Sequence, residues 1–409
     1  MADYDNGPKP KKALSARQEK TLCDQQITST KPGPILHDFA KMLRYVQEND
    51  ILLSKTGLLP MKALRPLNEA MHRPLEVGLT RPHLQSLPNV EGLFMLLRAS
   101  GLVRVEYKGK KRLLRIDDAM AADWEKLNEV EQFFCLLRIW SLWADPETVR
   151  NRCSSRCPIL PEYLFFVTDI PRMAKDCRGD VMDYYQFRPG TFNVALAELF
   201  GLIATQQQPA RKGQGWSVSR IETTAFGTSL CALLMQICPR LCTSFVATPE
   251  DYSFEQWQQH LAPYFPQLHR ELELVEDEPT EGVHILTVSV WDSWRQLAVP
   301  QASSMSLLAD AILDAFDFNR DHLYLFLIED RFGSVQEYKH FYMDDPPYAH
   351  ETSIGELGLQ PGQRFMFRYD FGDNWEFYIV VDRIDPADPG MQEIRQLESH
   401  GAAPSQYNW

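Results

Sequence analysis

Hydrophobic positions follow two different periods along the chain, and the change of period divides it. Between residues 35 and 247, apolar residues mainly recur every three to four positions, which is typical of amphipathic helices. After residue 284 they mainly recur every second position, in stretches such as HILTVSVWD, HLYLFLIED and RFMFRYDFGDNWEFYIVVD. An alternation of this kind is typical of strands. The pattern predicts a mainly helical N-terminal half and a strand-rich C-terminal domain.

Residues 35–145 show the element order of a winged helix. The stretches ILHDFAKMLRYVQEN, PMKALRPLNEAM and NVEGLFMLLRAS each predict a helix, and LVRVEYKGKKRLLRID predicts a hairpin that turns at Lys108 and Gly109. The same plan returns more weakly over residues 150–247, where an apolar helix is followed by a strand, a Lys-Gly turn and a second strand. We expect two mainly helical winged-helix-like units. A single helical domain with two hairpins is the alternative.

The other segments complete a multidomain α+β organisation. Residues 1–34 are polar and lack apolar periodicity, which predicts a flexible tail. Residues 248–283 contain a short helix and the acidic run ELELVEDEPTEG, so we interpret them as a connector. Residues 284–409 predict a compact α+β domain of ββαβββ order, for which a grasp-like arrangement, with one helix across a mixed sheet, is one hypothesis.

Charge divides the chain at nearly the same place. Residues 1–250 carry 33 Lys and Arg against 27 Asp and Glu, and the remaining residues carry 9 against 28. Only the first part is suited to lie against a polyanion. No apolar run approaches the roughly 18 to 20 residues that span a bilayer, and the N-terminal segment has no apolar signal core. We therefore expect a cytoplasmic protein without a membrane partner.

The eight cysteines lie mostly among apolar neighbours, which favours free thiols over a disulfide framework. Two groups nevertheless raise the question of zinc: Cys153, Cys157 and Cys177, and the pair Cys238 and Cys242. Their spacing is wider than that of common zinc-binding pairs, and no His lies nearby in the sequence. We therefore expect no metal site and no cofactor.

The hairpin of the first unit concentrates six cations within twelve residues. They are Arg104, Lys108, Lys110, Lys111, Arg112 and Arg115. Flexible cations on a wing suit contacts with phosphates, which give affinity without base selection. The preceding helix, NVEGLFMLLRAS, offers few polar side chains that could read base edges. A nucleic acid bound through residues 104–115 and a protein partner both remain open, and we prefer the protein partner.

The stretch FRYDFGDNWEFYIVVD combines acidic and aromatic residues around a tight turn. Strand alternation predicts two aromatic faces that pair with each other and pack on the helix. These faces are Phe365, Phe367, Tyr369 and Phe371 on one strand, and Trp375, Phe377, Ile379 and Val381 on the other. The opposite side would gather four carboxylates that could suit a hard cation. They are Asp370, Asp373, Glu376 and Asp382.

Three interpretations of this turn follow. Asp, Gly and Asn are the residues that a tight turn requires for its backbone conformation, so we interpret the stretch mainly as a turn scaffold. A partner-binding surface is the second interpretation, and a metal-dependent enzyme that uses the carboxylates of Asp370 and Asp373 is the third. The sequence contains no Walker-type phosphate loop, no His-Glu-x-x-His pair and no Gly-x-Ser-x-Gly elbow that would favour another catalytic class.

From about residue 284 onward the sequence resembles the plasmid pRiA4b Orf-3-like family. The matching stretches are VSVWDSWRQLAVP, SLLADAILDAFDF, HLYLFLI, GELGLQPGQRFMFRYDFGDNWEFYI and GAAPSQYNW. The motif at their centre consists of Tyr369, Asp370, Phe371, Gly372, Asp373 and Trp375. The basic half is also similar to the winged-helix-bearing extension of some larger relatives.

This resemblance implies a bacterial protein often encoded near mobile elements, and it implies no defined reaction. Many relatives have His where this chain has Tyr324 or Leu325, and again where it has Phe377, so a His-dependent catalyst is not expected. We predict a non-enzymatic adaptor or a DNA-associated regulatory protein of bacterial mobile-element type. Its acidic C-terminal domain would recruit a partner or shield the basic wing.

Overall fold

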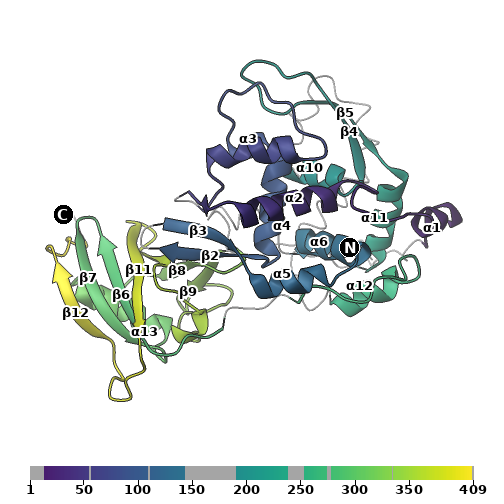
Figure 1. Ribbon diagram of the computed structural model, residues 1–409. Coiled ribbons are helices and arrows are strands. Elements are labelled where there is room, and N and C mark those ends of the chain that lie inside the picture. The colour runs from purple at the N-terminus through teal and green to yellow at the C-terminus, as the bar shows by residue number, and fades with distance from the viewer. Residues whose placement is uncertain are drawn as a thin grey trace, which may run out of the picture.

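The chain forms a multidomain α+β structure, in which helices dominate the N-terminal half and one large sheet dominates the C-terminal domain (Figure 1). The computed structural model describes residues 13–54, 57–108, 111–142, 190–237, 253–273, 278–333 and 335–407. The two periods of the hydrophobic pattern thus correspond to two regions of different secondary structure, as predicted.

Helices of the N-terminal half enclose a common apolar core. In chain order they are α1 (Ala16–Cys23), α2 (Ile35–Glu48), α3 (Met61–Ala70), the 3-10 turn η1 (Leu84–Ser86), α4 (Pro88–Ala99), α5 (Asp118–Glu125), α6 (Glu129–Leu142), α10 (Thr191–Leu199), α11 (Ala225–Ile237) and α12 (Phe254–Leu261). Two small sheets accompany them. One has the order β1-β3-β2, from β1 (Ile51–Leu52), β2 (Val103–Lys108) and β3 (Lys111–Ile116), and the other pairs β4 (Ile203–Gln207) with β5 (Val218–Thr223).

Helix α1 corrects the prediction of a flexible tail over residues 1–34, of which the structure describes residues 13–34. Its start is capped reciprocally by the side chains of Ser15 and Gln18. Leu22 is fully buried, and α1 packs against α11. A single buried anchor residue on a polar helix leaves no apolar period in the sequence, so the pattern could not reveal it.

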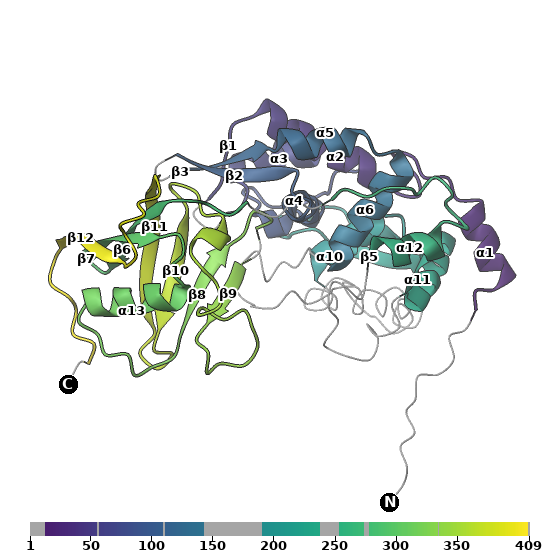
Figure 2. The ribbon, with the colours of Figure 1, turned by 90° about the horizontal axis from the view of Figure 1, so that it is seen from below.

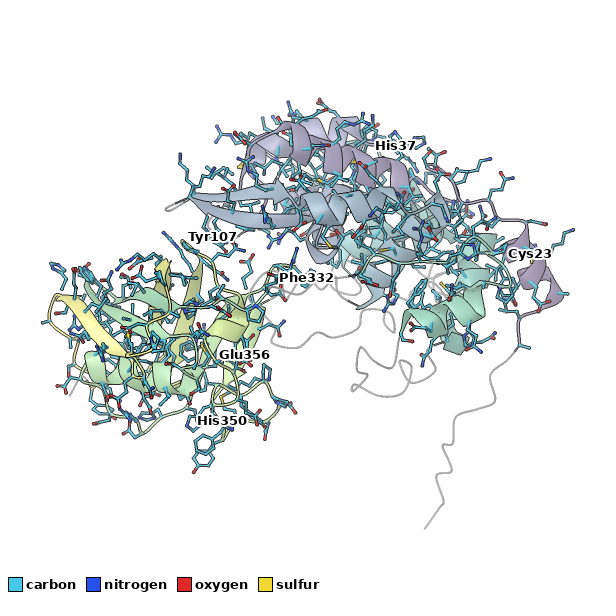
Figure 3. The ribbon with its side chains drawn as sticks, turned by 60° about the horizontal axis from the view of Figure 1, so that its bottom comes forward. Cys23, His37, Tyr107, Phe332, His350 and Glu356 are labelled. Atoms are coloured by element: carbon cyan, nitrogen blue, oxygen red, sulfur yellow. The ribbon has the colours of Figure 1, made fainter. Side chains whose placement is uncertain are left out.

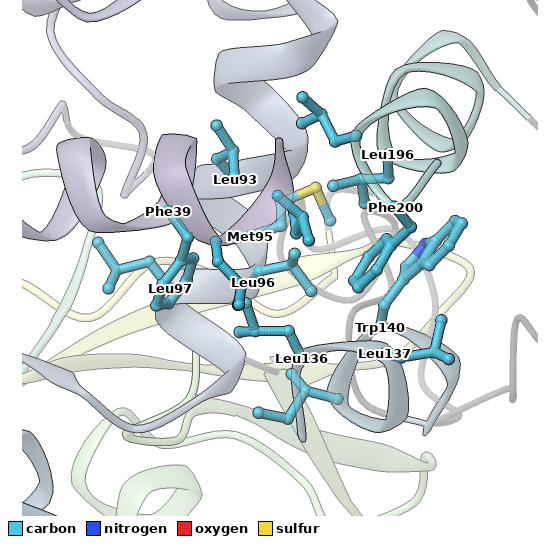
Figure 4. Packing of buried hydrophobic residues seen from close by; sticks show 14 of the residues in the cluster. Phe39, Leu93, Met95, Leu96, Leu97, Leu136, Leu137, Trp140, Leu196 and Phe200 are labelled. Atoms are coloured by element: carbon cyan, nitrogen blue, oxygen red, sulfur yellow. The ribbon is translucent and has the colours of Figure 1, made fainter. Parts of the chain in front are cut away.

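Helix α4 is the centre of the N-terminal core. All of its residues are buried, and it packs against α2, α3, α6 and α10. Figure 4 shows this packing, with Leu96 of α4 among Phe39, Leu136 and Phe200. The ring of Trp140 stacks on Phe200, and its indole N–H donates to Asn193 Oδ1 at 2.8 Å. Because α4 is enclosed on every side, it presents no face to solvent.

Helices α4 and α10 end in the same way and pack closely together. Each is followed by a glycine in the left-handed region, Gly101 at φ 70° and Gly201 at φ 71°, and then by an antiparallel hairpin. A Cβ on Gly92 would lie 2.7 Å from Leu196 Cγ, so the absence of a side chain at Gly92 permits the contact between the two helices. The two hairpins are therefore carried by helices that touch each other.

The C-terminal domain is a seven-stranded sheet of order β12-β7-β6-β11-β10-β8-β9, with each neighbouring pair antiparallel. Its elements are β6 (Val283–Val290), β7 (Ser293–Pro300), α13 (Met305–Ala315), β8 (Tyr324–Glu329), β9 (Val335–Lys339), η4 (Gly355–Leu357), β10 (Arg364–Tyr369), β11 (Trp375–Asp385) and β12 (Arg395–His400). The predicted mixed sheet is therefore wrong, because every neighbouring pair runs antiparallel. The alternation of apolar residues predicts strands but does not fix the direction in which they pair. Figure 2 shows α13 along one side of the sheet.

The aromatic face of the β10–β11 hairpin forms the second core, as predicted. Phe367 lies opposite Phe377 and Tyr369 opposite Trp375, and all four are buried together with the apolar residues of α13. Phe371 is the exception, since its side chain is 44% exposed. The strand ends at Tyr369, so the alternation does not extend to Phe371.

Two further predictions from the sequence concern the cysteines and membrane-spanning helices. Cys23, Cys135 and Cys231 are free, and burial raises the pKa of the Cys135 thiol to about 11. The other five cysteines, including both groups considered for zinc, lie outside the described residues. Within the part of the chain that the structure describes, no helix is long and apolar enough to cross a bilayer.

Candidate functional site

The basic hairpin β2–β3 divides its cations between solvent and protein. Arg104, Lys108 and Lys111 are exposed, whereas Lys110 lies outside the described residues. Lys108 Nζ lies 3.3 Å from Glu106 Oε1 on the same strand. Three cations thus face water on this hairpin, with one of them beside a carboxylate.

Arg115 is paired within the N-terminal half. Its Nη1 donates to Asp50 Oδ1 at 2.5 Å, and its Nε donates to Glu106 Oε2 at 3.3 Å. The hydrogen bond from Arg115 and its charge lower the pKa of the Asp50 carboxyl. Arg115 therefore fixes the hairpin to the segment that follows α2.

Arg112 joins the C-terminal domain through a carboxylate shared with Arg98. Arg112 Nη2 donates to Glu329 Oε2 at 2.5 Å, and Arg98 Nη2 donates to Glu329 Oε1 at 2.8 Å. We call these three residues the Glu329 clamp. It connects the end of β8 with both β3 and the last turn of α4.

Burial and the charges of the arginines have opposite effects on the pKa of Glu329 in the clamp. The side chains of Arg98 and Arg112 are 1% and 15% exposed, and that of Glu329 is 22% exposed. Burial alone would raise the pKa of the Glu329 carboxyl, but the charges and hydrogen bonds of the two arginines lower it below its usual value. Glu329 is therefore ionised at neutral pH and serves as the shared counter-ion.

Further contacts at the same junction bring the two regions close together. Arg331 Nη2 donates to Asp117 Oδ2 at 2.9 Å, and Asp117 also caps the start of α5. Gly362 approaches β2 so closely that a Cβ there would lie 2.6 Å from Tyr107 Cβ. Figure 3 shows Tyr107 and Phe332 at this junction, between the N-terminal half and the sheet. Ion pairs and close backbone approach therefore hold the hairpin against the C-terminal domain.

Sequence reasoning predicted Arg112 as a phosphate contact and missed Arg98, Glu329 and Arg331. A signal was present in two places, since Arg98 is the only charge in the apolar stretch LFMLLRAS and Glu329 directly follows the apolar strand YLFLI. A charge inside an apolar segment requires a partner, because burial of an unpaired ion is costly. The partners lie 231 residues apart, so no local pattern could connect them.

The residues of the family motif form a tightly bonded turn. Asp370 is 7% exposed and has φ 54°, and its Oδ1 accepts the backbone N–H of Gly372 at 3.0 Å and of Asp373 at 3.4 Å. The backbone N–H of Asn374 donates to the carbonyl oxygen of Asp370 at 2.6 Å. This geometry agrees with the turn scaffold that the sequence favoured.

Tyr369 fixes the loop that precedes β8. Its hydroxyl donates to the carbonyl oxygen of Asn319 at 2.6 Å and accepts the backbone N–H groups of Asp321 and His322 at 3.1 and 3.2 Å. Burial raises the pKa of the Tyr369 hydroxyl to about 12. Tyr369 therefore remains a neutral structural group.

The carboxylates near this turn do not converge as the acidic-patch hypothesis expected. Glu376 contacts Arg368 at 3.1 Å and accepts the hydroxyl of Tyr378 at 2.9 Å. Asp382 instead accepts hydrogen bonds from Thr287 and Gln296 at 2.6 and 2.9 Å. Among the described residues, no group of three or more His, Cys, Asp and Glu side chains is placed to hold a metal ion.

The C-terminal region is thus an antiparallel α+β domain with an Asp-capped aromatic hairpin at its centre. Residues 286–406 match the family model described as plasmid pRiA4b ORF-3-like protein, which confirms the resemblance for this domain.

Two known proteins are similar to part of the chain. An uncharacterized protein, y4hQ, of Sinorhizobium fredii is 32% identical over 112 residues, which are 27% of this chain and 56% of that protein. The chain thus spans little more than half the length of this curated relative. A crystal structure of the protein of unknown function MM3350 from Methanosarcina mazei Go1 is 21% identical, covers 30% of this chain and 72% of its own, and has a TM-score of 0.28.

Proposed function

We propose that this protein is a non-enzymatic adaptor that binds another protein, and that its N-terminal half contains two winged-helix-like units. The proposal for the first unit is supported by the order α2, β1, α3, α4, β2, β3 and by the pairing of β1 with β3, which are those of a winged helix. The second unit is supported more weakly, by α10, the β4–β5 hairpin and α11.

The observation that carries the adaptor proposal is the complete burial of α4. In a winged helix that reads DNA, the third helix enters the major groove and presents polar side chains to base edges. Here every residue of that helix is buried, and its closest partners include α10 of the other unit. The surfaces left for a partner are therefore the hairpins, the outer helices and the acidic domain, which favours protein recognition over base reading.

A second candidate is a DNA-associated regulator that contacts phosphates without base selection. It is supported by the exposed Arg104, Lys108 and Lys111 on β2–β3. In this proposal the Glu329 clamp shields the hairpin, because it keeps Arg112 engaged with the C-terminal domain. The association with bacterial mobile elements remains part of this proposal. A carboxylate enzyme at Asp370 is weaker, since that side chain is occupied by turn amides.

The decisive experiment is affinity capture from cells before and after nuclease digestion, combined with DNA titrations. The adaptor proposal expects a protein partner that is retained, in fixed ratio, after digestion. If all bound material were lost with the nucleic acid, the adaptor proposal would be wrong.

The DNA titrations compare the protein with a triple variant, Arg104→Ala, Lys108→Ala and Lys111→Ala. A regulator that uses this hairpin should lose up to about 2.7 from the slope of log K against log salt, about 0.9 for each phosphate contact. The control is the triple variant Arg211→Ala, Lys212→Ala and Arg220→Ala, which removes three exposed cations from the other hairpin segment. An equal loss in both variants would show that general charge, and not β2–β3, attracts DNA.

A further inference from the structure

A hollow of about 480 Å³ lies beside the family-motif turn. It is lined by Trp291, Asp373, Asn374, Trp375, Glu376, Tyr378 and Gln406. Its volume falls within the range of small-molecule sites, and its walls combine aromatic rings with carboxylates. We call it the Trp291 hollow. None of the sequence-based functional hypotheses includes Trp291.

Trp291, which lines this hollow, has an unfavourable backbone conformation. It occupies the two-residue turn between β6 and β7 with φ 51°, and its side chain is 72% exposed. Such turns normally use Gly, Asn or Asp, because a bulky side chain is strained in the left-handed region. A large, exposed aromatic residue in a strained turn contributes little to the fold, so it points to a role in recognition.

Trp375 forms the inner wall behind Trp291. The two ring centroids lie 5.0 Å apart at an interplanar angle of 41°, and Phe318 supports Trp375 from the core at 4.9 Å. Trp375 is 6% exposed, and among the described residues its indole N–H has no hydrogen-bond partner. Buried indole N–H groups usually find an acceptor, so Trp375 is held beneath the hollow with an unsatisfied donor.

The charge around the hollow is negative. Asp373 is exposed, and Glu376 lies at its side with one oxygen near Arg368 and the other accepting the Tyr378 hydroxyl. The chain after residue 250 carries 9 Lys and Arg against 28 Asp and Glu. Aromatic faces together with carboxylates attract organic cations, because the ring quadrupole and the fixed charges both favour positive charge.

We propose that the Trp291 hollow binds an organic cation, an alkylammonium or guanidinium group, against the rings of Trp291 and Tyr378. Asp373 and Glu376 supply the counter-charge. The cation can come from a free alkylammonium compound or from a Lys or Arg side chain of a partner protein, since each presents a positively charged nitrogen group to the rings. This site involves neither the basic hairpin nor the Glu329 clamp, so it stands independently of the proposed function.

Indole N–H resonances of ¹⁵N-tryptophan-labelled full-length protein provide the test. The probes are choline and its neutral isostere 3,3-dimethylbutan-1-ol, followed by N-acetylated and C-amidated Gly-Ser-X-Ser-Gly peptides in which X is Lys, Arg or Gln. Trp291→Phe assigns one resonance. We expect choline and the cationic peptides to shift the signals of Trp291 and Trp375 saturably, while the isostere and the Gln peptide do not.

Variants decide whether the hollow itself is responsible. Trp291→Ala should weaken cation binding about tenfold, as expected for loss of a cation–π contact, and Glu376→Gln should weaken it several-fold. Tyr342→Ala is the matched control, because Tyr342 is 76% exposed and does not line the hollow. Tighter binding of the Lys or Arg peptide than of choline identifies a partner side chain as the source, and the reverse identifies a free alkylammonium compound.

Three results would overturn the proposal. These are equal binding of choline and its neutral isostere, unchanged binding by Trp291→Ala, or no saturable shift with any cationic probe. Far-ultraviolet circular dichroism of each variant establishes that the fold is retained. Because Trp291 lies in an exposed turn, Trp291→Ala is expected to fold like the parent protein.

Discussion

Replacement of Glu329 by Gln should destabilise the protein more than removal of any one exposed cation of the basic hairpin. The amide keeps the shape of the carboxylate but removes the charge that pairs with both Arg98 and Arg112 at the junction. Breaking a buried ion pair by removal of one partner costs about 3 to 5 kcal/mol. Since the Glu329 side chain is 22% exposed, water compensates in part, and we expect the lower end, about 3 kcal/mol.

The assay is urea unfolding at pH 7, followed by circular dichroism, together with limited proteolysis between the two regions. Glu337→Gln is the matched control, because the Glu337 side chain is 20% exposed and its nearest cation, Lys339, lies 3.9 Å away. That change should cost less than about 1 kcal/mol. A triple replacement by Met, at Arg98, Arg112 and Glu329, should recover stability, because it removes the buried charges together.

Acid provides a second check on the same reasoning. The folded protein holds the pKa of Glu329 below its usual value, so the clamp contributes its full stability above the pKa of the unfolded chain. That contribution is lost as the pH falls through the folded pKa, where the carboxylate becomes protonated. The difference between the parent protein and Glu329→Gln should therefore shrink in acid. Equal stability at pH 7, or a difference that is unchanged in strong acid, would refute the account.

Three further predictions follow from single contacts. Burial lowers the pKa of His284 from 6.5 to about 4, so the free energy of unfolding should fall as the pH drops below 6.5. The loss should be about 2 kcal/mol at pH 5, and His284→Gln should remove it in urea titrations. Gly362→Ala should cost about 1 to 3 kcal/mol through contact with Tyr107, and more than Gly213→Ala, a left-handed glycine with open space around it; equal thermal shifts would contradict this. Asp370→Ala should lose about 1 to 2 kcal/mol and Asp370→Asn much less, whereas a folded Asn variant that lost a measured activity would favour the enzyme hypothesis.

The sequence predicted the features that repeat locally. The aromatic faces of β10 and β11 follow from strict alternation, and the helix α2 follows from Ile35, Phe39 and Val46 at helical spacing. The turn function of Asp370 follows from its type and its neighbours. These features depend on residues close in sequence, so a single chain is enough to reveal them.

Other features depend on tertiary contacts that produce no periodic pattern in the sequence. The capacity of Arg112 for phosphate contact was predicted from its neighbours, but its position is decided by Glu329, far away in the chain. The Trp291 hollow likewise combines the β6–β7 turn with the β10–β11 turn. The only signal in the sequence was a Trp near the end of the predicted strand HILTVSVWD, and it had meaning only once the structure placed it in a turn beside a second aromatic wall.

The enclosure of α4 also has an evolutionary consequence. Every position of this helix is buried, and Arg98 at its end is tied to Glu329. A change in volume at any of these positions must be matched on a neighbouring helix, because buried side chains are closely packed. We therefore expect related chains that contain α4 to diverge slowly along this helix and rapidly at the exposed Arg104 and Lys111. A low substitution rate would then distinguish the enclosed positions from the exposed ones.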